Sequence, residues 1–288
     1  MSADVLAVRA DVVRSRRMPA IAVLGRTEAR RILTSPTFPI LISYLLLVLG
    51  VDLLAGGDES AGLSERAQIA ELSAYVVLLL WGPLTFVATY LTATSSRRSG
   101  SEQLLVSAPV DGRRRDLALC LGVALGPVPA ALALAGVSAW LASGAGIAGE
   151  AADANWSWLD ISQVPAIVLG AGVLAVVVAR WLPFPGSLPV SFVALIMITG
   201  WLMSGGGGRA LRPWFAPYVS IEWWSDSGWH SGASPVWHLM YLLALCALGI
   251  CVIALKQPER RTGWLAAGGV AVAAVITAGL LQLPPLSP

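Results

Sequence analysis

Few residues of this sequence are of types that could do chemistry, and none of them forms a recognisable catalytic set. A phosphate-binding loop of the form G-x-x-x-x-G-K-[ST] requires a lysine, and the only lysine, Lys256, precedes Gln257 near the end of an apolar run. The chain therefore cannot supply the nucleotide site of an ATPase. A literal G-x-G-x-x-G occurs over residues 144–149, but no strand is expected before it, so it does not predict dinucleotide binding.

Metal and acid–base chemistry would need clustered histidines, cysteines or acids. The sequence has two histidines, and its three cysteines lie inside apolar runs without C-x-x-C spacing, so we expect neither zinc nor disulfides. The acids expected at the outer face follow no ligand spacing; they are Asp153, Asp160, Glu222 and Asp226. A membrane-embedded enzyme acting on a lipid-linked substrate at this face is the first alternative function.

Composition predicts that most of the chain is surrounded by lipid. The sequence is 56% hydrophobic and 12% charged, with a mean hydropathy of +0.73, whereas soluble domains are about 25% charged. The apolar residues form runs of about 20, the length that crosses a ~30 Å hydrocarbon core. Seven such runs cover residues 38–55, 72–93, 117–141, 161–182, 187–204, 236–255 and 264–283. We expect an all-α, polytopic membrane helix bundle of six to seven transmembrane helices.

Details within these runs refine the prediction. The third run contains Gly126, Pro127 and Pro129, which we expect to kink one long helix rather than to break it in two. Gly122 and Gly126 have the G-x-x-x-G spacing of a close helix contact. No ionisable residue is expected in the middle of a run, which disfavours an ion-coupled transporter, the second alternative function.

The positions of lysine and arginine predict the orientation, because short cytoplasmic loops retain positive charge. With seven spans and a cytoplasmic N-terminus, only Arg66, Arg209 and Arg212 of the 19 basic residues lie outside. The first 34 residues lack the pattern of a signal peptide. The near-exclusive use of arginine is typical of a GC-rich bacterial genome. We therefore expect a multi-pass protein of the bacterial plasma membrane.

Residues 19–34 predict an amphipathic helix at the inner membrane surface. Apolar residues fall on one helical stripe and charged residues mostly elsewhere; the stripe is Ile21, Leu24, Ala29 and Ile32, and the charges are Arg26, Glu28, Arg30 and Arg31. The alternative is a basic juxtamembrane segment that only sets topology.

Residues 95–116 predict a short cytoplasmic helix between the second and third spans. Ser99 and Glu102 have capping-box spacing, and Pro109 ends the helix. Leu104 and Leu105 would then face water, which is costly unless something covers them. Either a partner protein covers them or they dip into the lipid headgroups, and the sequence leaves both interpretations open.

Two motifs in this order resemble those of permease subunits of the ABC-2 family of ABC transporters. The first, E-x-R-R-x-x-x-S-P, forms a cytoplasmic elbow helix before span one and matches Glu28, Arg30, Arg31, Ser35 and Pro36. The second, R-x-x-G-[ST]-x-E-x-L-L-x-[ST]-P after span two, resembles residues 97–109, with the acid shifted by one and Ala108 inserted before Pro109. A tryptophan-rich loop, residues 205–235, lies where the family has a re-entrant element, whereas the seventh span departs from the usual six.

The resemblance implies an ATP-driven exporter of a hydrophobic or amphipathic substrate such as a drug, antibiotic, peptide or lipid. Two ABC ATPase subunits would hold ATP and Mg²⁺, this chain would hold no cofactor, and its other partners would be a second permease and membrane lipid, with no nucleic acid. The implied ATPase-coupling residues are Gly100, Glu102, Gln103, Leu104, Leu105, Ala108, Pro109, Glu28, Arg30 and Arg31. The implied substrate-pathway residues, from spans two and five, are Tyr75, Trp81, Thr85, Thr89, Phe192, Met197 and Thr199.

This interpretation divides the chain into three parts. Residues 1–34 are a cytoplasmic N-terminus with the elbow helix, and residues 35–255 are a six-span transmembrane domain. Residues 256–288 are a cytoplasmic loop, the seventh span and an external C-terminus.

Overall fold

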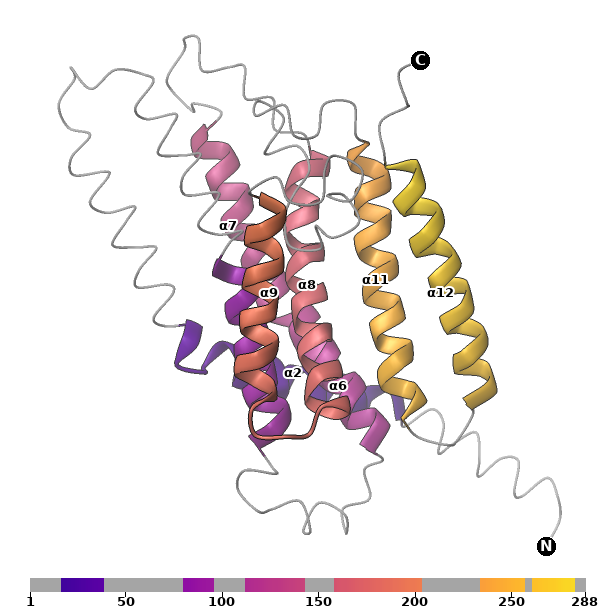
Figure 1. The fold of residues 1–288 in the computed structure, drawn as a ribbon. Helices are drawn as coiled ribbons and strands as arrows, with labels where there is room; N and C mark the ends of the chain where they lie inside the picture. The colour runs from indigo at the N-terminus through magenta and orange to yellow at the C-terminus, as the bar shows by residue number, and fades with distance from the viewer. Residues whose placement is uncertain are drawn as a thin grey trace, which may run out of the picture.

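A computed structural model describes residues 17–38, 80–95, 112–142, 158–203, 234–256 and 261–282, and every regular element in these ranges is helical. Figure 1 shows the helices arranged side by side, with long axes nearly parallel for most of them. The labelled helices are α2 (Arg17–Leu33), α6 (Gly112–Leu125), α7 (Pro127–Ala142), α8 (Trp158–Trp181), α9 (Ser187–Met203), α11 (Pro235–Leu255) and α12 (Arg261–Leu281). A further helix occupies residues 80–95.

Four stretches of the described residues are long and apolar enough to cross a membrane: Gly112–Gly136, Ser162–Trp181, Pro235–Leu255 and Arg261–Leu281. They correspond to the third, fourth, sixth and seventh predicted runs. Helix α9, within the fifth run, is a shorter apolar helix. The chain is therefore a helical membrane bundle. Almost all of the first run and the start of the second lie outside the described residues.

The third run crosses as one helix with a local interruption at Gly126, between α6 and α7. The Gly126 amide donates to the Gly122 carbonyl at 3.0 Å, and the Ala130 amide donates to the Gly126 carbonyl at 3.3 Å. Helical hydrogen bonds thus continue across the point where Pro127 lacks a donor. The prolines therefore do not divide this run into two separate spans, as expected from the sequence.

Helix α8 forms the centre of the bundle and α12 its edge. In the most apolar window of each, 67% of α8 is buried inside the chain but only 22% of α12. Helix α8 packs against α6, α7, α9 and α11, whereas α12 packs chiefly against α11. Figure 1 shows α11 standing between α8 and α12. The surface of α12 therefore faces away from the rest of the chain over most of its length.

Candidate functional site

The amphipathic helix α2 docks directly onto α6 through small residues. A β-carbon added at Gly122 would lie 3.0 Å from the backbone nitrogen of Ala29 and 3.0 Å from the β-carbon of Glu28. One added at Gly126 would lie 3.2 Å from the β-carbon of Ala29. The close helix contact predicted from the Gly122 and Gly126 spacing is confirmed, and its partner is α2.

The predicted stripe of α2 faces this contact, with one correction. Ala29 and Ile32 are buried, and Arg30 and Arg31 are exposed, as expected. Glu28 was expected among the exposed charges, but it is only 7% exposed. That expectation was wrong because position 28 lies four residues from both Leu24 and Ile32, which places it on the same helical face as the apolar residues.

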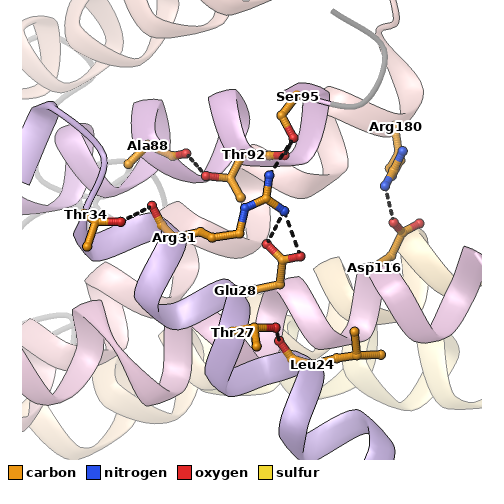
Figure 2. Close-up of polar contacts among 10 residues, drawn as sticks. All are labelled: Leu24, Thr27, Glu28, Arg31, Thr34, Ala88, Thr92, Ser95, Asp116 and Arg180. Atoms are coloured by element: carbon orange, nitrogen blue, oxygen red, sulfur yellow. Dashed lines mark hydrogen bonds and ion pairs between the residues drawn. The ribbon is translucent and has the colours of Figure 1, made fainter. Parts of the chain in front are cut away.

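The buried Glu28 organises a polar link from α2 to the helix over residues 80–95 (Figure 2). Arg31 Nη1 donates to Glu28 Oε1 at 3.2 Å and to Oε2 at 3.3 Å. The second guanidinium nitrogen, Nη2, donates to Ser95 Oγ at 3.2 Å. Ser95 is the last described residue before the segment that resembles the coupling motif. The link therefore connects the end of this helix to α2.

A second ion pair lies at the same end of the bundle, where α6 meets α8. Arg180 Nη2 and Asp116 Oδ1 are 2.5 Å apart, and the two side chains are only 13% and 10% exposed. Figure 2 draws this pair in the same view as the Glu28 link. Lys256, just after α11, donates through Nζ to the Arg180 carbonyl, and Trp181 Nε1 donates to the Val252 carbonyl at 3.3 Å. Three helices are thereby joined at this end.

The sequence does not predict a buried role for Asp116, because this residue directly precedes the third apolar run and falls in the expected cytoplasmic loop. The structure places it one turn inside α6. A signal was present: an acid at the start of one predicted span and Arg180 at the end of the next lie on the same side of the membrane, so they could pair. Consecutive spans are antiparallel, which brings these two ends to one level.

Most of the implied coupling residues belong to the segment between the helix over residues 80–95 and α6. Gly100, Glu102, Gln103, Leu104, Leu105, Ala108 and Pro109 lie outside the described residues. Those on α2 are described: Glu28 and Arg31 join the polar link, and Arg30 is exposed and takes no part in it. The structure thus describes the two ends that flank the coupling segment.

Five of the seven implied pathway residues have described side chains, and these differ in burial. Trp81, Thr85 and Thr89 are at most 1% exposed inside the bundle, and Trp81 Nε1 donates to the Pro127 carbonyl at 3.2 Å. Phe192 is half-buried against neighbouring helices, while Met197 on α9 is 61% exposed. Tyr75 and the side chain of Thr199 lie outside the described part.

A buried polar contact joins α11 and α12 at the opposite end of the bundle. His238 and Gln282 are both fully buried, with His238 Nδ1 and Gln282 Oε1 2.8 Å apart. The Ser234 amide donates to the Gln282 carbonyl at 3.3 Å. These contacts attach the end of α12 to the start of α11. The peripheral helix is therefore fixed to its neighbour by hydrogen bonds as well as by apolar packing.

The described residues contain no group of three or more His, Cys, Asp or Glu side chains that could hold a metal ion. The cysteines Cys120, Cys246 and Cys251 are buried and unbonded to one another. By fold and site, the chain is a helical membrane protein with buried polar contacts at both ends of the described bundle. Comparison with protein-family models, with curated proteins and with solved structures finds no match.

Proposed function

We propose that this chain is the permease subunit of an ABC exporter of the ABC-2 type, energised by a separate ATPase subunit. One observation supports this function above the others. The segment over residues 96–111, which resembles the coupling motif in sequence, is flanked on both sides by anchored structure. Ser95 before it is held by Arg31 of α2, and α6 after it is held by the pair of Asp116 and Arg180.

This anchoring suits a segment that transmits force. A displacement of residues 96–111 would pull on the end of one helix and on the start of α6, and both are tied to further helices. Through Arg31 it would reach α2, and through Arg180 it would reach the central helix α8. A loop attached only to flexible chain would absorb the displacement instead. In the proposed complex an ATPase subunit binds Leu104 and Leu105 in an apolar groove, and its movement displaces the segment.

The rest of the assembly follows from the same proposal. Helix α2 acts as the elbow helix at the cytoplasmic surface of a bacterial plasma membrane, and the full chain has six or seven spans. Two permease copies, or this chain with a related permease, join two ATPase subunits that bind ATP and Mg²⁺. The substrate is hydrophobic or amphipathic, because the charged residues of the four described spans all lie near their ends.

Co-purification tests this function directly. The full chain is extracted mildly from its native membrane, alongside a variant with Leu104→Asp and Leu105→Asp and a control with Leu104→Met and Leu105→Met. We expect a P-loop ATPase to accompany the wild type and the methionine control, and to be lost from the aspartate variant. Recovery of the wild-type chain without an ATPase would overturn the proposal in favour of a membrane enzyme or an ion-coupled transporter.

A further inference from the structure

Two threonine hydroxyls are buried inside the bundle without a hydrogen-bond partner among the described residues. Thr85 and Thr89, one turn apart on the helix over residues 80–95, are both 0% exposed, and neither Oγ1 atom is bonded. A third threonine of this helix behaves differently, because Thr92 Oγ1 donates to the Ala88 carbonyl at 2.8 Å. A buried polar group without a protein partner is usually satisfied by an internal water molecule or an ion.

The two hydroxyls lie where this helix meets both the kinked span of α6 and α7 and the central helix α8. Trp81 faces the kinked span, since its Nε1 donates to the Pro127 carbonyl, and Gly82 faces α8. Successive residues of a helix are about 100° apart around its axis. Thr85 and Thr89 therefore fall between the directions of Trp81 and Gly82, at the junction of the three helices.

The relative directions of these helices follow from their contacts. Gly82 faces Ile167 in the first half of α8, and the Tyr90 hydroxyl lies 2.5 Å from Ser187 Oγ, just beyond the end of α8. The helix over residues 80–95 therefore runs in the same direction as α8. Helix α6 runs in the opposite direction, because an ion pair joins its start to the end of α8. The threonine helix and the kinked span are thus antiparallel.

This arrangement brings Thr85 to the level of a backbone carbonyl that the kink deprives of its usual donor. Trp81 contacts Pro127, so one turn along each antiparallel segment Thr85 lies level with Val123. Pro127 has no amide hydrogen, and the Val123 carbonyl cannot receive the usual helical bond from it. Val123 is 0% exposed. In membrane helices, carbonyls freed by proline are satisfied by neighbouring helices, by Ser or Thr side chains, or by ordered water.

The ligand that suits this junction is small and neutral. The charged residues of α6 and α8 lie near the ends of these helices, so they offer an ion no counter-charge at this depth. Thr85 and Thr89 have no exposed surface, so a larger molecule has no access to them in this conformation. A buried water molecule makes about three hydrogen bonds, and two hydroxyls with one carbonyl provide that number of partners.

We propose that an internal water molecule binds between the Thr85 and Thr89 hydroxyls and the Val123 carbonyl. The water accepts a hydrogen bond from one hydroxyl and donates its two hydrogens to the other hydroxyl and to the carbonyl. It thereby joins the threonine helix to the kinked span at the point where Pro127 interrupts the helical hydrogen bonds. The site depends on the packing of the bundle and not on the transport function proposed above, so either proposal can fail without the other.

Removing each hydroxyl tests whether it is bonded, because the sign of the change in Tm differs between the two cases. Thermal unfolding of the full chain in one detergent compares Thr85→Val and Thr89→Val with the control Thr92→Val, whose hydroxyl bonds within its own helix. We expect the first two variants to lower Tm by a few degrees, since each leaves the water and its other partners short of a bond. The control should unfold close to the wild type. An unchanged or raised Tm for Thr85→Val and Thr89→Val would mean that the hydroxyls are unbonded and would overturn the proposal.

Radiolytic labelling distinguishes a bound water from a polar side chain outside the described residues. A brief X-ray pulse converts water into hydroxyl radicals, which oxidise the nearest side chains, and mass spectrometry locates the oxidised residues. We expect oxidation of Trp81 and Phe86, although both are at most 1% exposed. The label should be lost when Thr85→Val and Thr89→Val are combined, and kept when Thr85→Ser and Thr89→Ser are combined. Absence of label in the wild type, which needs no variant to fold, or equal label in the valine variant would overturn the proposal.

Discussion

Two ion pairs at one end of this bundle differ in how much water surrounds them, and this difference decides what each contributes. The Arg31 side chain is 51% exposed and its partner Glu28 only 10%. In the second pair, Arg180 and Asp116 are both at most 13% exposed. Water screens an exposed charge, whereas a buried charge that loses its partner has neither water nor another charge to stabilise it. Removing one partner should therefore destabilise the protein more in the second pair than in the first.

Replacing Asp116 by Asn should destabilise the protein strongly. The substitution leaves the buried Arg180 guanidinium without its Asp116 counter-charge. Breaking a buried ion pair in this way lowers the free energy of unfolding by about 3 kcal/mol. Thermal unfolding in one detergent should show a lower Tm for Asp116→Asn than for the exposed control Arg26→Gln. Adding Arg180→Gln to Asp116→Asn should recover part of the loss, since both charges are then removed. Additive losses in the double variant would contradict a direct interaction.

Removing Arg31 should have a much smaller effect on stability. A half-exposed ion pair contributes about 1 kcal/mol or less, so Arg31→Ala should lower Tm only slightly. Arg31→Lys provides the comparison, because it keeps the charge but cannot reach Glu28 and Ser95 with two separate nitrogens in the same way. Both variants should unfold close to the wild type. A fall in Tm as large as that of Asp116→Asn would show that exposure does not decide how much each ion pair contributes to stability.

At the scale of the elements, the contact of α2 with α6 depends on the absence of a side chain. Gly122 faces the backbone of α2, and backbone atoms cannot move aside as the end of a flexible side chain can. A side chain at position 122 would therefore have to push the two helices apart, because no change of rotamer could make room for it. This gives α2 a fixed register on the bundle.

Gly122→Ala should destabilise the protein by about 1–3 kcal/mol through overpacking. Gly136→Ala is the matched control: it is in the next helix of the same span, and a β-carbon there meets nothing within 4 Å. Because alanine is the better helix former by up to about 1 kcal/mol, the control should be neutral or stabilising. Thermal unfolding of both variants provides the measurement. Equal Tm values for the two variants would argue against close packing at Gly122.

The membrane helices could be predicted from the sequence because a helix that crosses the hydrocarbon core needs about 20 mostly apolar residues. The predicted runs at residues 236–255 and 264–283 correspond to α11, Pro235–Leu255, and α12, Arg261–Leu281. The interruption at Gly126 and the amphipathic face of α2 were also predictable, from proline chemistry and helical periodicity. The burial of Glu28 is the exception, because its charge suggests exposure whereas its position in that period places it on the buried face.

At the scale of the whole molecule, the candidate site was much less predictable than its elements. Asp116 and Arg180 are 64 residues apart in the chain, since 180 − 116 = 64. Their pairing depends on the rotation and the depth of two helices. Neither quantity is encoded by hydropathy, which reports only that each segment is apolar. The same holds for Arg113 and Trp264, which meet across two helices that are not consecutive in the chain.

These pairings also determine the relative directions of the four described spans. The start of α6 lies with the end of α8 through Asp116 and Arg180, and with the start of α12 through Arg113 and Trp264. The end of α11 lies there too, since Lys256 reaches Arg180. Helices α6 and α12 therefore run in one direction, and α8 and α11 in the other. This end is the basic one, so the positive-inside rule predicts that it faces the cytoplasm.

Reporter fusions test this topology. A reporter joined after Gln257 should lie in the cytoplasm, and one joined after Leu286, beyond α12, should lie outside. An enzyme that is active only outside the membrane should therefore be active in the second fusion and inactive in the first, whereas a reporter that fluoresces only in the cytoplasm should give the reverse. The same location for both junctions would remove α12 as a span. Exchanged locations would mean that the basic end, with its two ion pairs, faces outward and cannot meet a cytoplasmic ATPase.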